Sequence, residues 1–260
     1  MKNSVKDFIL DLIKRAGKKL SDLYGKISDY EIKSGNPKDL VTTADRAIEE
    51  FIKKEIEKRF PSDTIIAEES KILEKTGRDK WYIDPIDGTT NFIRKIPFFG
   101  ISIAYEVRDT LQEGAIHFPI LKEIFHATRG KGAFKNDQKI CVSSRNNIIN
   151  SLLATGFACL RSNLDNNNLK NLNRILPLIH DIRRTGSACY DLCSVACGRF
   201  DGFWELNLAS WDVKAGALLV NEAGGKVTDF DGKEDYIERK EILATNGLIH
   251  EKVLDLFRQI

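Results

Sequence analysis

The feature that most constrains the fold is a change in the hydrophobic pattern near residue 145. Strand-like segments follow one another from Phe98 to Phe134, with turns at Arg108-Asp109, Pro119 and Gly130, which predicts an antiparallel meander. Beyond Ser151, strands alternate with helices, which is typical of an α/β layer. The expected strands lie near 152–157, 182–184, 199–205, 226–229 and 241–245, and the expected helices near 165–178, 187–197, 211–223 and 248–259.

Two helices and two short strands are expected before the meander. Residues 5–24 carry apolar side chains at helical spacing, and a second helix follows Thr42-Thr43 and stops at Pro61. The polar residues 30–40 predict a loop or hairpin between them. Short buried strands are expected at 64–67 and 81–83, each ending in acidic residues.

The chain is therefore expected to contain two subdomains, an α+β part at 1–145 and an α/β part at 146–260. The absence of a Gly/Ser-rich linker between them predicts that the two parts share an interface. A length of 260 residues with 42% hydrophobic side chains is enough for a sizeable core.

Charge and cysteine content narrow the class of protein. A net charge of +2, from 40 basic and 38 acidic residues, argues against a protein that coats nucleic acid. No apolar stretch is long enough to cross a membrane, and Lys6, Asp7, Asp11 and Lys14 interrupt any signal-peptide core. Five cysteines without a zinc-type CxxC pair agree with a cytoplasmic protein, and Cys189, Cys193 and Cys197 are interpreted as packing residues on one helix face.

Separated acidic residues stand at the ends of expected elements. Asp45 opens the second helix, Glu68-Glu69 end one strand, Asp84 and Asp87 follow another, and Asp212 opens a late helix. Carboxylates that cluster repel one another unless cations hold them together. Magnesium prefers a few carboxylates together with water and substrate phosphate. The pattern therefore predicts a site for more than one metal ion.

The run from Asp84 to Phe92, with the sequence DPIDGTTNF, sharpens this hypothesis. Pro85 stiffens the turn between the two carboxylates, and Gly88 lets the backbone approach a ligand closely. The following residues are expected to begin a short helix whose free N–H groups can bind phosphate, and Thr89 offers a hydroxyl that can orient water. The alternative interpretation is a simple turn in which Asp87 caps the next helix.

Five blocks in this order resemble the inositol monophosphatase family. They are DLVTTAD (39–45), AEES (67–70), DPIDGTTNF (84–92), RRTGSACYDLCSVACGRFDGFWE (183–205) and WDVKAGALLVNEAGG (211–225). The chain departs from the pattern at Ala67, where glycine is usual, and at Lys214, where a small residue is common. The resemblance implies a layered α/β/α/β/α sandwich of the sugar-phosphatase type, within the α/β (α+β) class.

The resemblance also implies metal and catalytic roles. Glu68, Asp84 and the carbonyl of Ile86 would hold a first Mg²⁺, Asp84, Asp87 and Asp212 a second, and a third would bind near Glu68. Thr89 and Asp45 would form a hydrogen-bonded pair that activates the attacking water, with Glu68 beside them. The first subdomain would thus carry most of the metal ligands.

A larger set is implied to contact the substrate. Its members are Ile86, Asp87, Gly88, Thr89, Arg183, Gly186, Ser187, Ala188, Glu205 and Asp212. The N–H groups of Gly88 and Thr89 would bind phosphate, whereas Arg183 to Ala188 and Glu205 would face the alcohol. Lys33 is expected near the site.

The expected function is Mg²⁺-dependent hydrolysis of inositol 1-phosphate to inositol and phosphate by direct attack of a metal-activated water. No DxDx[TV] motif suggests a covalent aspartyl-phosphate intermediate. Alternatives are a fructose-1,6-bisphosphatase or dual-specificity sugar phosphatase, a histidinol-phosphate or 3′-phosphoadenosine-5′-phosphate phosphatase, and a regulatory binding protein with a relict site. The resemblance further implies a homodimer and lithium sensitivity. The charge balance and the hydropathy predict no nucleic-acid partner and no membrane partner.

Overall fold

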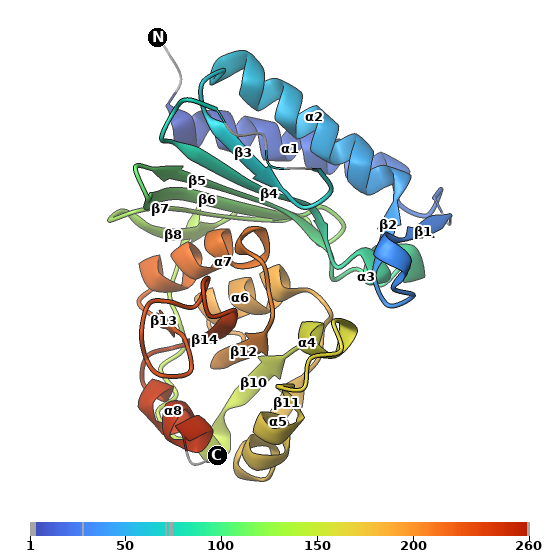
Figure 1. The fold of residues 1–260 in the computed structure, drawn as a ribbon. Coiled ribbons are helices and arrows are strands. Elements are labelled where there is room, and N and C mark those ends of the chain that lie inside the picture. The colour runs from blue at the N-terminus through green and yellow to red at the C-terminus, as the bar shows by residue number, and fades with distance from the viewer. Residues whose placement is uncertain (1–3, 28, 71, 73–74, 259–260) are drawn as a thin grey trace.

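The chain folds into five stacked layers in the order helix, sheet, helix, sheet, helix (Figure 1). The structure is a computed structural model that describes residues 4–27, 29–70, 72 and 75–258. Because each sheet has helices on both faces, both sheets bury their apolar side chains. The layered α/β/α/β/α sandwich expected from the sequence is therefore confirmed.

The outer helical layer consists of α1 (Val5–Leu23) and α2 (Thr43–Arg59). Each begins with a capping box, formed by Ser4 and Asp7 in α1 and by Thr42 and Asp45 in α2. Their apolar faces pack against the first sheet in one core cluster. The two predicted N-terminal helices are confirmed.

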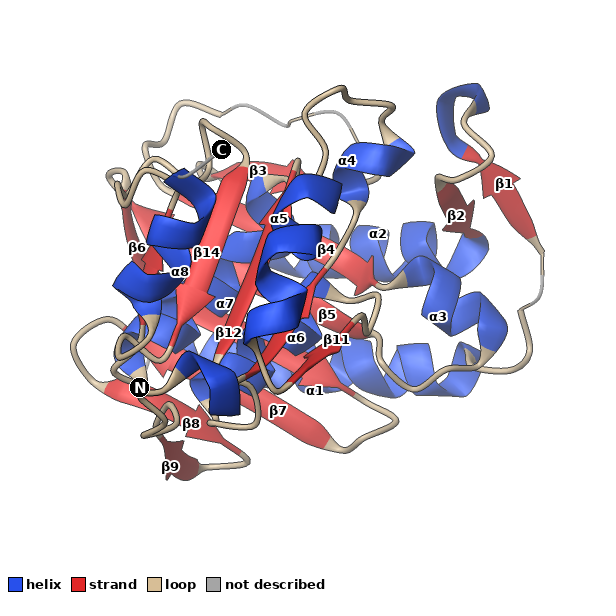
Figure 2. Ribbon diagram, turned by 90° about the horizontal axis from the view of Figure 1, so that it is seen from below, coloured by secondary structure: helices blue, strands red, loops and turns tan. Residues whose placement is uncertain are grey.

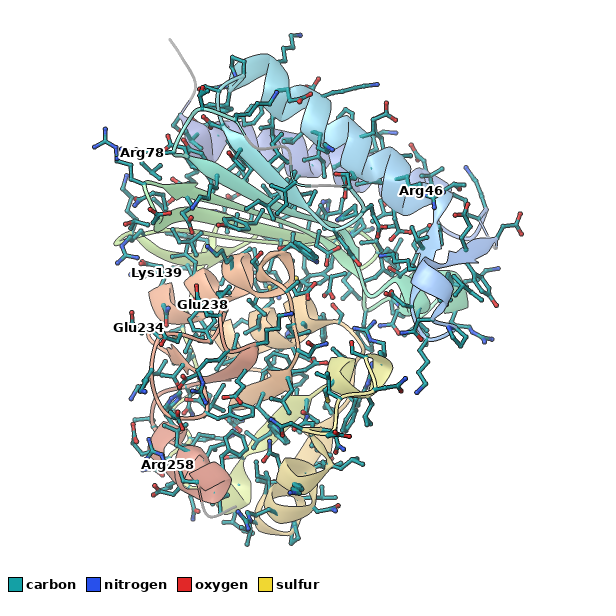
Figure 3. The ribbon with its side chains drawn as sticks, in the orientation of Figure 1. Arg46, Arg78, Lys139, Glu234, Glu238 and Arg258 are labelled. Atoms are coloured by element: carbon teal, nitrogen blue, oxygen red, sulfur yellow. The ribbon has the colours of Figure 1, made fainter. Side chains whose placement is uncertain are left out.

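The first sheet has seven strands in sequence order, and only its first pair is parallel. The strands are β3 (Thr64–Ala67), β4 (Lys80–Asp87), β5 (Gly100–Val107), β6 (Thr110–Phe118), β7 (Glu123–Thr128), β8 (Gly132–Lys135) and β9 (Gln138–Ile140). The predicted meander is confirmed, and β9 extends it beyond the expected range. Arg78 and Lys139 project outward at the edge of this layer (Figure 3).

The second sheet has five strands in the order β11-β10-β12-β14-β13, and Figure 2 shows β12 beside β14. The strands are β10 (Leu152–Thr155), β11 (Asp181–Arg183), β12 (Gly202–Leu206), β13 (Lys226–Thr228) and β14 (Glu241–Thr245). Strand β10 is parallel to β11 and β12, whereas β14 is antiparallel to both of its neighbours. All five strands lie where the sequence places them, within a few residues.

Helices α6 (Ala188–Ala196) and α7 (Ser210–Glu222) lie between the sheets. Small residues allow close packing here, because a Cβ added to Gly216 would lie 2.7 Å from the Leu192 Cβ, and one added to Gly114 would lie 3.1 Å from the Ala215 Cα. Since α7 contacts strands of both sheets, one helical layer is shared across the boundary predicted near residue 145.

Helices α5 (Leu169–Ile175) and α8 (His250–Arg258) cover the outer face of the second sheet. The expected end of the last helix at residue 259 lies outside the described residues. The short helix α4 (Ala158–Arg161), which follows β10, is a feature that the sequence analysis did not predict.

A small hairpin, β1 (Tyr30–Ile32) and β2 (Leu40–Thr42), lies beside the short helix α3 (Thr89–Arg94) at one end of the layers (Figure 1). It confirms the expected hairpin at 30–40, with the 3₁₀ turn Lys33–Gly35 between its strands. Two further 3₁₀ turns lie at Ile148–Asn150 and Leu176–Leu178. Across the described part of the chain, no helix is both long and apolar enough to span a membrane.

Candidate active site

A cavity of about 160 Å³ lies where the ends of both sheets meet the hairpin and α3. Its lining comes from the 84–91 run, from the start of α6, and from β12 and α7. The lining residues are Asp39, Leu40, Glu68, Asp84, Ile86, Asp87, Gly88, Thr89, Thr90, Asn91, Thr155, Gly156, Arg161, Arg184, Gly186, Ser187, Ala188, Asp191, Glu205, Leu208 and Asp212. The structure therefore brings together every sequence-predicted site residue except Arg183 and Asp45, and Asp45 touches the lining through Thr89.

Asp84 and Asp87 reach the cavity because the end of β4 is irregular. The strand was expected to end at Asp84 but continues to Asp87, and the pairing with β5 shifts between the two aspartates. Such a bulge redirects side chains relative to a regular strand. The Ile86 N–H donates to Asp84 Oδ1 at 3.0 Å, which fixes the first carboxylate against the turn.

Asp212 and Glu68 come from other elements. Asp212 lies in the first turn of α7, where its Oδ2 accepts a hydrogen bond from the Ala209 N–H at 2.7 Å and completes the helix cap. Glu68 follows β3, and its Oε1 accepts a hydrogen bond from Lys33 Nζ at 2.7 Å. Lys33 also reaches Glu69 at 2.5 Å, so the hairpin touches the acidic cluster directly.

Burial and neighbouring carboxylates raise the proton affinity of Asp84, Asp87 and Asp212. Burial is the main reason that the pKa of Asp84 lies well above its ordinary value, and Glu68, Asp87 and Asp212 add to the effect. Burial also raises the pKa of Asp212 and of Asp87, although hydrogen bonds from Ser187 and Cys189 partly oppose the shift at Asp87. Such a cluster is stable in its charged form only when cations offset its charge.

The donor chemistry of this cluster fits a hard divalent cation. No three histidine, cysteine or carboxylate side chains among the described residues converge closely enough to enclose an ion as they stand. Backbone and hydroxyl donors, however, engage only one oxygen each of Asp84, Asp87 and Asp212. Among the described residues, the second oxygen of each carboxylate thus has no backbone or hydroxyl donor, and oxygen ligands are those that Mg²⁺ prefers.

Thr89 and Asp45 form the expected hydrogen-bonded pair, with Thr89 Oγ1 donating to Asp45 Oδ1 at 3.1 Å. The other carboxylate oxygen of Asp45 accepts from the backbone and hydroxyl of Thr42, which locks the side chain at the start of α2. Burial raises the pKa of Asp45, and these hydrogen bonds oppose the shift. Thr89 Oγ1 also lies 3.2 Å from the Ile86 carbonyl, so the hydroxyl is tied to the metal-ligand turn.

Gly88 has a backbone conformation that other residues rarely adopt, with φ of 90°. A Cβ at this position would lie 2.9 Å from the Phe98 carbonyl oxygen. The glycine therefore allows the turn to pass beneath the cavity, and it leaves the first N–H groups of α3 without a side-chain cap.

The two parts of the chain are tied together beside this turn. Asn91 Nδ2 donates to the Phe98 carbonyl at 2.6 Å and to the Thr185 carbonyl at 2.9 Å. Ser187 caps α6 by accepting from the Tyr190 N–H, and its hydroxyl donates to Asp87. Ser187 therefore contacts the acidic cluster itself, and not only the space expected for the alcohol.

Glu205 lies on β12, and the backbone makes room for it. A Cβ on Gly156 would lie 2.1 Å from Glu205 Oε2, so a glycine is needed at that position. Glu205 Oε1 accepts from the Ala158 N–H at 2.9 Å, which couples the carboxylate to α4. Burial raises the pKa of Glu205 to about 7.

The structure places Arg183 away from the cavity, where Nη1 pairs with Asp181 at 2.6 Å on the surface. Its neighbour Arg184, the first residue after β11, lines the cavity instead. The three residues of β11 are too few to show an alternation of polar and apolar side chains. The sequence alone therefore does not tell which of the two arginines faces the cavity.

Arg161 and Asp191 also line the cavity and were not predicted. Asp191 is buried and accepts from Thr185 Oγ1 at 2.7 Å. Its spacing from Ser187 and Ala188 on one helix face is a signal that could have identified it. Arg161 ends a four-residue helix that the hydrophobic pattern of the sequence did not predict.

Comparison with known proteins agrees with this geometry. The model of the inositol monophosphatase family matches residues 1–260. The chain belongs to the inositol monophosphatase family. It is therefore a phosphatase, in a family of metal-dependent enzymes.

Similar proteins match along most of their length. An inositol-1-monophosphatase of Mesorhizobium japonicum is 37% identical, covering 92% of this chain and 91% of its own. A protein of Escherichia coli strain K12 named Nus factor SuhB is 39% identical, covering 95% of this chain and 94% of its own. A crystal structure of the Bartonella henselae extragenic suppressor protein suhB has a TM-score of 0.92 at 38% identity and covers 99% of each chain.

Proposed function

We propose that the chain hydrolyses the phosphate monoester of a small polyol, with inositol 1-phosphate as its reference substrate, and that two to three Mg²⁺ ions assist the reaction. The observation that carries the proposal is the cluster of four carboxylates at one cavity, in which Asp84 and Asp87 are buried and Asp212 and Glu68 are half-buried. Four carboxylates in one cavity are costly unless cations compensate them.

Carboxylates and one carbonyl group would ligate the metal ions, and backbone N–H groups would bind the phosphate. Glu68, Asp84 and the Ile86 carbonyl would hold one ion, and Asp84, Asp87 and Asp212 another. When bound, such ions supply Lewis-acid polarisation of phosphate oxygens and lower the pKa of water. The backbone N–H groups of Gly88 and Thr89 face the same space and suit the phosphate oxygens.

Thr89 is placed to handle the proton of the attacking water. Because its hydroxyl hydrogen is donated to Asp45, the lone pairs of Oγ1 remain to accept a hydrogen bond from water. Asp45 orients the hydroxyl in turn, since its other oxygen is fixed by Thr42. Glu68 lies on the same side of the cavity and adds negative charge that favours proton removal.

The alcohol is expected to lie against Gly186, Ser187, Ala188 and Glu205. Glu205 can accept hydrogen bonds from polyol hydroxyl groups. The proposed attacking group is a metal-activated water rather than a side chain.

The test is phosphate release from inositol 1-phosphate by the purified chain, with Mg²⁺ and after chelation. A panel with fructose 1,6-bisphosphate, histidinol phosphate and 3′-phosphoadenosine 5′-phosphate identifies the preferred alcohol. Mg²⁺-dependent hydrolysis of at least one polyol monophosphate is expected. Turnover that persists after chelation would overturn the metal assignment, and no turnover of any substrate would favour a binding protein with a relict site.

A further inference from the structure

Lys214 lies on α7 two residues after Asp212, at the position where the chain carries a lysine instead of a small residue. Its side chain is only 15% exposed, so most of it is withdrawn from water. A charge in such a place is costly unless the surrounding structure supplies partners for it. The reaction proposed above gives Lys214 no role.

Two side chains of the first sheet receive the Lys214 ammonium. Lys214 Nζ pairs with Glu106 Oε2 and lies 4.0 Å from the centroid of the Tyr82 ring. The Tyr82 hydroxyl donates to Glu106 Oε1 at 3.1 Å, and Lys80 Nζ lies 3.6 Å from the same oxygen. Tyr82 and Glu106 are buried, so the ion pair and the cation–π contact are little screened by water. We call Tyr82, Glu106 and Lys214 the helix anchor.

The helix anchor joins the two elements that carry the ligands of one proposed ion. Tyr82 and Asp84 lie two residues apart on β4, so their side chains share one face of the strand. Asp212 and Lys214 lie two residues apart on α7, which packs against this sheet (Figure 1). A shift of α7 relative to β4 would therefore move one ligand away from the other.

Strand β5 provides a second contact at the same end of the helix. Ser102 pairs with Asp84 across the two strands. Ser102 Oγ also donates to the carbonyl of Trp211, the residue directly before Asp212, at 3.3 Å. The start of α7 is thus attached to the first sheet at two places, and together they set the separation of Asp84 and Asp212.

The other end of α7 is attached to the same sheet in a different way. Glu222 accepts hydrogen bonds from the N–H groups of Gly130 and Gly132, at 2.7 and 2.8 Å, in the turn between β7 and β8. This contact lies about 15 Å farther along the helix axis than Asp212. The helix therefore has an attachment at each end, and only the helix anchor lies beside a proposed metal ligand.

We propose that Lys214 is a positioning residue for the metal site, whose contacts with Glu106 and Tyr82 hold α7 where Asp212 and Asp84 can share one ion. Lys214 is not among the residues that line the cavity, so it acts through the helix and not by touching the ion or the substrate. This inference rests on the proposed function, to which it adds a residue that sets metal affinity.

The experiment measures metal binding without substrate, using Mn²⁺ as the probe and the electron paramagnetic resonance signal of free Mn²⁺ as the readout. Lys214→Met keeps the aliphatic stem and removes the charge. Lys214→Met combined with Glu106→Gln removes both charges of the ion pair. The matched control is Glu222→Ala, which breaks the attachment at the other end of α7. Thermal unfolding of every variant is recorded in the absence of metal.

Lys214→Met should raise the Mn²⁺ dissociation constant roughly tenfold, as expected when support of a metal ligand is lost. The Glu222→Ala variant should unfold at a lower temperature but bind Mn²⁺ as the wild type does. The double variant should recover most of the unfolding temperature that Lys214→Met loses, because Glu106 is then no longer a buried charge without its main partner. Its affinity for Mn²⁺ should nevertheless stay as weak as that of Lys214→Met.

An unchanged dissociation constant in Lys214→Met would overturn the inference. Recovery of Mn²⁺ affinity together with the unfolding temperature in the double variant would overturn it as well, and so would an equal loss of affinity in Glu222→Ala, because metal affinity would then follow stability alone. Failure of the proposed function gives a different result, in which the wild type itself binds no Mn²⁺ or hydrolyses no phosphate monoester with Mg²⁺.

Discussion

The two sides of the cavity are built in different ways. The acidic side is formed by Glu68, Asp84, Asp87 and Asp212, and the arginine side by Arg161, Arg184, Asp191 and Glu205. On the acidic side, Asp84 and Asp87 sit on a bulged strand end, and Asp212 caps a helix that is packed between two sheets. On the arginine side, Arg161 ends a four-residue helix and Arg184 follows a three-residue strand, and both are solvent-exposed. The acidic residues are thus fixed by elements of the core, whereas short peripheral elements supply the arginines.

The largest expected effect breaks the acidic side. Asp84→Asn should reduce phosphate release from inositol 1-phosphate roughly 10³-fold or more, because a charged ligand shared by two proposed ions is lost. The fold should survive, since the substitution removes a buried carboxylate whose neighbours repel its charge. Turnover and calorimetric unfolding test the two statements together, and near-normal turnover would contradict the assigned role of the acidic side.

A smaller loss is expected when the proton-handling pair is broken. Thr89→Ala should lower kcat about 10²- to 10³-fold with little change in KM, because the hydroxyl that orients water is removed. Thr89→Ser keeps the hydroxyl and should restore most of the activity. If serine proves as poor as alanine, the methyl group rather than the hydroxyl is what matters at this position.

On the arginine side, Glu205→Gln should change the pH dependence of stability. The pKa of Glu205 is raised to about 7 in the folded chain, against an ordinary value of 4.5. The protonated carboxyl therefore contributes fully to the free energy of unfolding below about pH 4.5. This contribution is lost as the pH rises through 7. That loss is roughly 3 kcal/mol at most.

Glutamine has no such titration and can still accept the Ala158 N–H. The variant should thus become more stable relative to the wild type between pH 5.5 and pH 8, as measured by urea unfolding at both values. A difference that does not change with pH would show that Glu205 titrates near its ordinary value. Substrate affinity should fall in the same variant, so stability and binding move in opposite directions.

The smallest effect is expected from a substitution that displaces the Glu205 carboxylate without removing its charge. Gly156→Ala would place a Cβ 2.1 Å from Glu205 Oε2 and displace the carboxylate. KM for inositol 1-phosphate should rise about tenfold while kcat stays within about threefold, the result expected when binding is lost equally from substrate and transition state. The effect on KM should vanish when Glu205 is already alanine, and a persistent effect would locate the disturbance elsewhere.

The sequence predicted the acidic side well because its residues lie at element boundaries. Strand ends and helix starts can be recognised from hydrophobic spacing and caps, and carboxylates at such places without basic neighbours are unusual. The spacing did not predict the irregularity of β4 that brings Asp84 and Asp87 to the same cavity, since a bulge depends on pairing with β5.

The arginine side was predicted less well for physical reasons. A strand of three residues such as β11 shows no alternation, so the sequence could not decide between Arg183 and Arg184. Helix α4 is too short for a periodic pattern, and its place beside the hairpin depends on contacts with residues more than 120 positions away, such as Asn36 with Arg161. Asp191 was within reach of helical spacing and was overlooked.

The close packing around α7 limits which residues can be substituted during evolution of such a protein. Gly216 against Leu192 and Gly114 against Ala215 leave no room for added volume, so inherited variation is strongly constrained wherever it would shift the helix that carries Asp212. Exposed positions such as Arg161 face no such restriction. A lineage that keeps α7 unchanged can therefore exchange the residues that recognise the alcohol and acquire new substrates without rebuilding the site of hydrolysis.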